Sequence, residues 1–204
     1  MSVMQALLTE VPDKGLPGRP DPELDPYLDA AAAVVRRRGW SGTSLRDVAR
    51  EAGVDRTTIY RRLGPKDSVF RLVAAREVHH LIQRAIEVAQ SSRLGPELVV
   101  ELLATSIEYC DENPVISKLI EDDPEMIAGF LARGVPDVIE RFRSTLAPVL
   151  EMGMDLGAIA RRDPTIVTDW IVRMGLSALV TPPDGDLREF LAEILVPVLT
   201  PERT

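Results

Sequence analysis

Residues 43–66, TSLRDVAREAGVDRTTIYRRLGPK, contain the pattern that most limits how this chain can fold. Apolar residues recur at positions 45, 48, 49 and 52, which is the spacing of one helical face. Thr43 or Ser44 can serve as the N-cap, and Ser44 with Asp47 has the spacing of a capping box. Gly53 follows the last apolar position, where a left-handed residue would end the helix. The pattern therefore predicts a short helix that stops at a glycine turn.

A second short helix is predicted to follow this turn. Asp55 can cap it, and Ile59 and Leu63 lie four residues apart on its inner face. The small side chain of Ala49, four residues before Gly53, lets two helices cross closely, as in a helix-turn-helix. The outer face of the second helix carries guanidinium, hydroxyl and phenol groups, which can contact base edges and phosphates. The alternative is an ordinary helical hairpin with a solvated basic face.

The composition favours an all-α protein. Apolar residues make up 45% of the 204 residues, but aromatic residues only 4%, and Ala, Leu, Val and Ile dominate. No run of 18 apolar residues occurs, so we expect no membrane span, and the first ten residues lack the features of a secretory signal. The single cysteine, Cys110, cannot form an intramolecular disulfide, which fits a reducing cytosol. We therefore expect a cytoplasmic protein.

Charge is distributed unevenly along the chain. Residues 26–84 contain twelve Lys or Arg and six Asp or Glu, a net charge of +6, although the whole chain carries −8. The remaining residues therefore carry −14. A basic segment attached to an acidic one is a pattern that suggests contact with nucleic acid through the basic part.

Several motifs together resemble the DNA-binding domain of regulators of the tetracycline-repressor (TetR) type. The resemblance covers about residues 26–75. Leu63 replaces the aromatic ring that the family mostly has, and Gly64-Pro65 replaces a less rigid turn. The motifs are Gly39-Trp40, Thr43 to Ala49, Gly53-Val54, Ile59 to Leu63 and Lys66.

The resemblance implies an N-terminal three-helix DNA-binding domain and a larger helical domain for ligand binding and dimerisation. We expect a disordered tail over residues 1–24, the helix-turn-helix domain over 25–72 and the helical domain over 73–204. A long helix from about Lys66 to Gln90 would link the two domains. The residues expected to contact an operator are Thr43, Ser44, Arg56, Thr57, Thr58, Tyr60, Arg61, Arg62 and Lys66.

The second domain offers large, soft side chains for a ligand cavity and a dimer interface. Met and aromatic residues suit an adaptable apolar pocket, although each could simply fill the core. The predicted cavity residues are Tyr109, Met126, Phe130, Phe142, Met152, Trp170 and Met174. The resemblance places the dimer interface on the last two long helices, at about 165–179 and 187–199. The predicted interface residues are Trp170, Ile171, Met174, Phe190, Leu191 and Ile194, of which some are expected to be ordinary core.

The expected function is sequence-specific DNA binding by a homodimer, with repression of a palindromic operator relieved by a small, mainly apolar effector. The alternative is a helical DNA-binding regulator that a protein partner controls without a small molecule. The acidic residues at 121–125 suit the start of a helix better than a metal site. The sequence contains no catalytic triad pattern, phosphate-binding glycine loop or paired-cysteine spacing, so we predict neither an enzyme nor a cofactor or metal.

Overall fold

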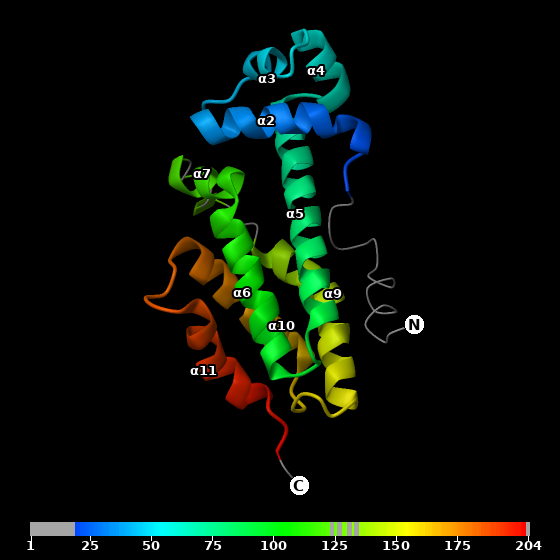
Figure 1. The fold of residues 1–204 in the computed structure, drawn as a ribbon, viewed down its shortest axis with the longest axis vertical. Coiled ribbons are helices and arrows are strands. Elements are labelled where there is room, and N and C mark those ends of the chain that lie inside the picture. The colour runs from blue at the N-terminus through cyan, green and yellow to red at the C-terminus, as the bar shows by residue number, and fades with distance from the viewer. Residues whose placement is uncertain (1–18, 123–124, 126–127, 130–131, 133–134, 203–204) are drawn as a thin grey trace. The chain divides into compact units, whose positions relative to one another are not determined.

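The computed structural model describes residues 19–122, 125, 128–129, 132 and 135–202 and is all-α, with no strand among these residues (Figure 1). A short 3₁₀ helix, η1, precedes α2, and several of the predicted helices appear with limits close to those expected. None of the described helices is long and apolar enough to cross a membrane. The elements are η1 (Pro22–Leu24), α2 (Asp25–Arg38), α3 (Leu45–Glu51), α4 (Arg56–Leu63), α5 (Lys66–Ser91), α6 (Pro96–Glu112), α7 (Pro114–Asp122), α9 (Val135–Asp155), α10 (Pro164–Val180) and α11 (Leu187–Leu199).

The chain divides into two compact units. The head unit contains residues 19–80 and the described part of 111–133, and the body unit contains 81–110 and 135–202. The long helix α5 belongs to the head unit up to His80 and to the body unit from Leu81. The segment after residue 110, which the sequence placed with the larger domain, thus groups with the head. The domain boundary between residues 72 and 73 stays a prediction from sequence.

Local signals explain most helix ends in the head unit. Ser44 caps α3 by accepting a hydrogen bond from the Asp47 amide, and Asp55 caps α4 by accepting one from the Thr58 amide, as predicted. Gly39 ends α2 with φ 69°, and Gly53 forms the turn between α3 and α4 with φ 67°.

The start of α2 differs from expectation. Asp25-Pro26 has the sequence of an N-cap followed by proline, yet Asp25 already lies inside the helix. The same Asp-Pro signal occurs four residues earlier, where Asp21 accepts a hydrogen bond from the Glu23 amide and begins η1. Because η1 runs directly into α2, the earlier signal starts the helical segment.

The core of the head unit is built from one apolar face of each of its first helices. Leu28, Val48 and Ile59 are fully buried there, from α2, α3 and α4 respectively. Trp40 packs against Phe70 of α5 with ring centroids 4.8 Å apart. Leu63, which replaces an aromatic ring, is buried in the same core. Burial of these side chains, each contributing about 1.5–3 kcal/mol, holds α3 and α4 in a fixed relation to each other.

The body unit has a separate core made by α6, α9, α10 and α11, with Leu150, Leu191 and Leu199 almost fully buried. An ion-pair cluster on its surface joins the start of α11 to α6. Arg188 donates to Glu101 Oε2 at 3.0 Å and to both carboxylate oxygens of Glu108. The hydrogen bonds to Glu108, which have the larger effect, and the one to Glu101 raise the pKa of Arg188 above its ordinary value.

Candidate DNA-binding surface

The helix-turn-helix formed by α3 and α4 presents one polar face of α4 away from the core. Ile59 and Leu63 are buried, whereas Arg56, Tyr60 and Arg61 are exposed. At 100° per residue, positions 56, 57, 60 and 61 fall within about 140° of one another, in an arc that contains neither Ile59 nor Leu63. The structure therefore brings together four of the predicted contact residues, Arg56, Thr57, Tyr60 and Arg61, on one face.

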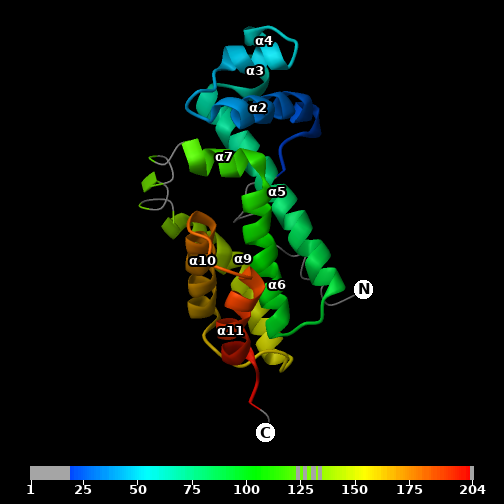
Figure 2. The same ribbon diagram turned by 60° about the vertical axis from the view of Figure 1, so that its left-hand side comes forward.

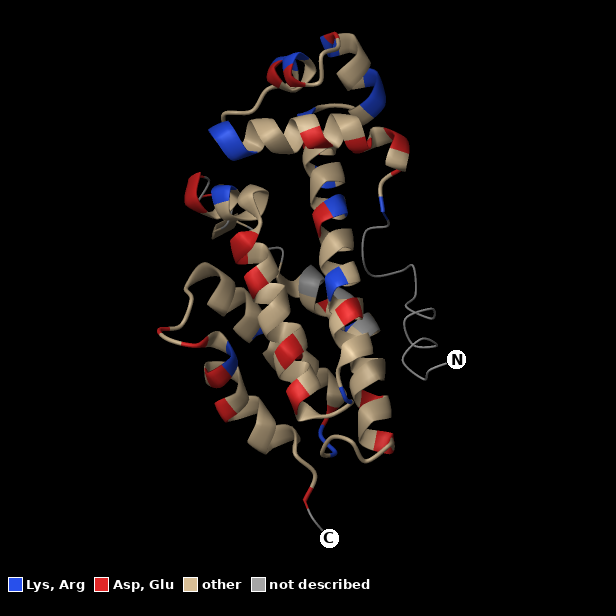
Figure 3. Cartoon of the chain, in the orientation of Figure 1, with Lys and Arg blue, Asp and Glu red and all other residues tan. Residues whose placement is uncertain are grey.

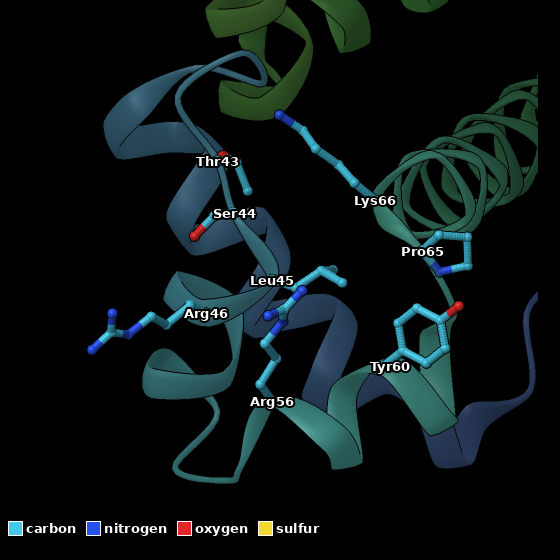
Figure 4. A pocket seen from close by; sticks show the side chains of 8 residues that line it. All are labelled: Thr43, Ser44, Leu45, Arg46, Arg56, Tyr60, Pro65 and Lys66. Atoms are coloured by element: carbon cyan, nitrogen blue, oxygen red, sulfur yellow. The ribbon is translucent and has the colours of Figure 1, made fainter.

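A shallow hollow of about 540 Å³ lies beside this face (Figure 4). Arg46 of α3 and Arg56 of α4 contribute guanidinium groups to its lining, and Tyr60 contributes a phenol ring beside Pro65. Thr43, Ser44, Leu45 and Lys66 complete the lining. The hollow thus combines three cationic residues with hydroxyl groups and apolar carbon, which is a surface chemistry suited to a phosphate backbone and base edges.

Acidic partners divide the arginines of the head unit into two groups. Arg37, Arg38 and Arg50 form ion pairs with Glu51 or Asp47 at 2.5–3.0 Å. Hydrogen bonding from Ser44, with further help from Arg38 and Arg50, lowers the pKa of Asp47 below its ordinary value, so this carboxylate stays charged. Among the described residues, Arg46, Arg56 and Arg61 have no acidic partner within 4.0 Å, so their charge is available to a ligand. Lys and Arg on α3, on α4 and at the end of α2 are visible in Figure 3.

Other predicted contact residues are engaged within the protein. Thr43 is buried, and its hydroxyl donates to the Gly39 carbonyl at 2.7 Å, so it shapes the turn and its hydroxyl does not face a groove. The Ser44 hydroxyl donates to the Asp47 carboxylate within α3, and the Thr58 hydroxyl donates to the Asp55 carboxylate that caps α4. Arg62 lies off the shared face of α4 and is 3.7 Å from Glu23. The Thr43 side chain is thus engaged within the protein, and its contact with DNA stays a prediction from sequence.

Lys66 begins α5, as predicted, and its ammonium is already oriented. The Nζ atom donates to the Ser41 carbonyl at 3.2 Å and lies 5.1 Å from the centre of the Trp40 ring. An ammonium has three donors, so two remain for a phosphate. The structure also adds Arg46, which sequence reasoning missed. The sequence did contain an indication of this role, because Arg46 occupies an outward position of α3 between the apolar residues at 45 and 48.

The predicted cavity residues do not gather in one place among the described residues. Phe142 and Trp170 are more than a third exposed, so neither lines an enclosed cavity within a single chain. Tyr109, Met152 and Met174 are half-buried, whereas Met126 and Phe130 lie outside the described residues. The Cys110 thiol is held in an apolar setting that raises its pKa to about 11.

The predicted interface residues fall on two faces of α10 and α11. Ile171 and Leu191 are buried in the core of the body unit, so they belong to the part of the predicted set that was expected to be ordinary core. Both helices are apolar on more than one side, and the inner side belongs to the core. Trp170, Phe190 and Ile194 are exposed, together with Ile166 and Val198. These five residues, spaced four apart along each helix, form what we call the apolar stripe.

The helix-turn-helix and its basic face define a DNA-binding regulatory protein. The sequence pattern described as "Bacterial regulatory proteins, tetR family" matches residues 28–73. An uncharacterized HTH-type transcriptional regulator of Mycobacterium tuberculosis (strain H37Rv) is 27% identical over 183 residues, which cover 87% of this chain and 85% of that protein. Residues 28–73 thus carry the tetR family pattern, and the chain is similar over most of its length to HTH-type transcriptional regulators.

Solved structures share the fold over most of the chain. The TetR family repressor AlkX from Dietzia sp. strain DQ12-45-1b, implicated in biodegradation of n-alkanes, superposes with a TM-score of 0.60 at 23% identity. This match covers 88% of the present chain and 96% of AlkX. The regulator AibR, in complex with isovaleryl coenzyme A and operator DNA, gives a TM-score of 0.55 at 19% identity, covering 87% of this chain and 97% of AibR.

Proposed function

We propose that this chain acts as a homodimeric repressor whose two heads bind a palindromic operator. The observation that carries the proposal is the face of α4 on which Arg56 and Arg61 lie exposed, with no acidic partner among the residues that the structure describes. A short helix of this kind fits the major groove, where arginine can bind guanine through two hydrogen bonds. Arg46 and Lys66 flank that face and are proposed to hold phosphates.

A second part of the proposal is release by a small, mainly apolar effector. AlkX is named a repressor implicated in biodegradation of n-alkanes, and AibR is described with both isovaleryl coenzyme A and operator DNA. Both names support an acyl or alkyl ligand for this fold. The large side chains of the body unit are mostly Met, Leu, Ile and Val, which suit such a ligand.

Operator binding can be tested without knowing the operator. The full chain is used to select sequences from a random duplex pool, and the selected DNA is then titrated with variants. Arg56→Ala or Arg61→Ala should weaken binding by about 1–3 kcal/mol and relax specificity. Lys66→Ala should weaken all sequences alike and reduce the salt slope by about one unit.

The matched control is Arg84→Ala, which removes an exposed arginine from the body-unit part of α5. This variant should bind the selected DNA like the parent protein. If Arg56→Ala, Arg61→Ala and Arg84→Ala all bind equally well, the assignment of α4 as the recognition helix is wrong.

The effector is tested by titrating selected DNA in the presence of an n-alkane series or isovaleryl coenzyme A. A compound that binds should lower operator affinity, and the operator should lower affinity for that compound by the same factor, typically about 5–150-fold. If a compound saturates the protein and operator affinity does not change, control by a protein partner becomes the better explanation.

A further inference from the structure

A partly buried polar cluster joins α2, α5 and the start of α7 within the head unit. Arg76 and Glu77 are consecutive residues of α5 and are only 7% and 8% exposed. Arg76 Nη1 donates to Asp29 Oδ1 of α2 at 2.7 Å, and Arg76 Nε lies 3.5 Å from Glu77 Oε1. Charged groups are rarely buried unless they are paired, because desolvation is costly. A pair retained at this position therefore calls for an explanation beyond packing.

Asn113 extends the cluster to α7. Its side-chain amide donates to Glu77 Oε2 at 2.6 Å. Its side-chain oxygen accepts hydrogen bonds from the Val115 and Ile116 amides at 3.0 and 3.2 Å, which caps the start of α7. One side chain thus begins α7 and joins it to α5. We call Asp29, Arg76, Glu77 and Asn113 the α2–α5–α7 cluster; His80 lies at its edge, 3.9 Å from Glu77.

The other end of α7 also contacts the head unit. A Cβ atom added at Gly39 would lie 2.9 Å from Asp122 Oδ2, so the end of α7 sits directly against the glycine that ends α2. Between these two ends, Val115 and Leu119 pack against the core of the head unit. Figures 1 and 2 show α7 beside the C-terminal end of α2. The helix is therefore fixed at both ends and along one face.

We propose that α7 is a functional part of the DNA-binding head and that Asn113 is the positioning residue that couples α7 to α5 and α2. Through the α2–α5–α7 cluster, α2, the first half of α5 and α7 respond to operator binding as one cooperative body. The chain passes from the body unit to the head unit at residues 110–111, just before Asn113. The operator part of this inference rests on the proposed function.

The test is amide hydrogen exchange, followed by mass spectrometry, on the full chain and on Asn113→Asp. A carboxylate at this position can still accept from the Val115 and Ile116 amides, so the cap is kept. It cannot donate to Glu77, and the two carboxylates would repel each other. Asn113→Ser keeps a capping oxygen without adding charge, which covers the case in which Asn113→Asp does not fold. Ser91→Ala, which removes hydrogen bonds within α5 alone, is the matched control.

In the free protein, the Asn113 variants should speed exchange about tenfold or more in α7 and also in α2 and residues 66–80, because a hydrogen bond to a charged group is lost. Exchange in residues 96–110 and in the Ser91→Ala control should stay unchanged. If exchange rises only within residues 114–118, Asn113 is merely a cap and the proposal is overturned.

Selected DNA supplies the second measurement. In the parent protein, DNA should slow exchange in α7 together with α2 and α4, and in the Asn113 variants the effect on α7 should be lost. Protection of α4 without protection of α7 would overturn the cooperative role. If no DNA is bound at all, the proposed function fails, but the exchange pattern of the free protein still decides the role of Asn113.

Discussion

At the scale of single residues, two glycines with positive φ differ in what surrounds them. Gly39 has φ 69° and ψ 171°, a region open to almost no other residue, and an added Cβ would meet Asp122 at 2.9 Å. Gly53 also has positive φ, but nothing lies within 4 Å of an added Cβ. A side chain would therefore strain the backbone at both positions, but it would meet a neighbouring residue only at Gly39.

We therefore expect Gly39→Ala to destabilise the head unit more than Gly53→Ala, with the steric part adding about 1–3 kcal/mol. Adding Asp122→Ala to the Gly39→Ala variant should recover the stability lost through the steric contact, whereas the loss caused by backbone strain should remain. The measurement is urea unfolding followed by Trp40 fluorescence in a Trp170→Phe background. Equal midpoints for the two alanine variants would contradict the close approach of α7 to Gly39.

Cys110 is the only thiol, and its surroundings make it unreactive. Burial raises its pKa to about 11, so very little thiolate exists near neutral pH. At pH 8 the folded protein should react with iodoacetamide on the order of 100-fold more slowly than the urea-unfolded protein. Reaction at a similar rate in both states would reopen a role for this cysteine in redox sensing.

At the scale of elements, the helix caps show what a sequence can and cannot predict. Ser44, Asp55 and Gly53 were assigned correctly because a cap depends on residues within about four positions. The limits of α11, Leu187–Leu199, also match the prediction, since Asp186 begins it and Thr200 ends it.

Features that depend on distant residues were not predictable. Asn113 meets Glu77 across 36 positions, and no local pattern indicates that contact. The sequence could not show which of the predicted interface residues, such as Ile171 and Leu191, would be buried in the core, for a related reason. A helix that is apolar on several sides does not show which side meets its own core, so the choice requires the tertiary structure.

The cap of the proposed recognition helix gives a pH prediction. Hydrogen bonds from the Thr58 amide and hydroxyl lower the pKa of Asp55 below its ordinary value of 3.8. The stabilisation by the charged cap is therefore present above about pH 4 and is lost as pH falls through the lowered pKa. Asn is also a good cap but does not titrate in this range.

The parent protein should thus be more stable than Asp55→Asn near neutral pH, and the difference should shrink in acid. Unfolding midpoints measured from pH 2 to 6 provide the comparison. Asp163→Asn, which alters the cap of α10 in the body unit, controls for general acid effects. A difference between parent and Asp55→Asn that does not change with pH would show that the charge of Asp55 contributes nothing.

At the scale of the whole molecule, the apolar stripe on α10 and α11 is exposed in a single chain. Phe190 and Ile194 are 42% and 50% exposed, and Ile166, Trp170 and Val198 continue the stripe. Side chains of this size are worth about 1.5–3 kcal/mol each when buried. A second copy of the same stripe, related by a two-fold axis, is self-complementary and can cover it.

The expected outcome is a dimer of the 22.5 kDa chain that Ile194→Glu converts to monomer. A charge buried in an apolar interface without a partner is strongly unfavourable, whereas the same charge on a solvated monomer is not. Sedimentation at micromolar concentration measures the change. Leu156→Glu, at a leucine that is 61% exposed beyond the end of α9 and outside the stripe, should remain dimeric.

Loss of the dimer should also weaken operator binding, although the heads stay folded. Two heads on one palindrome must reach major grooves about 34–36 Å apart, and a monomer binds only one half-site. Ile194→Glu should therefore bind full and half operators with similar affinity, whereas the parent and Leu156→Glu should prefer the full operator. If the parent protein sediments as a monomer, or if Ile194→Glu remains a dimer, the stripe is not the interface and the palindromic operator loses its structural basis.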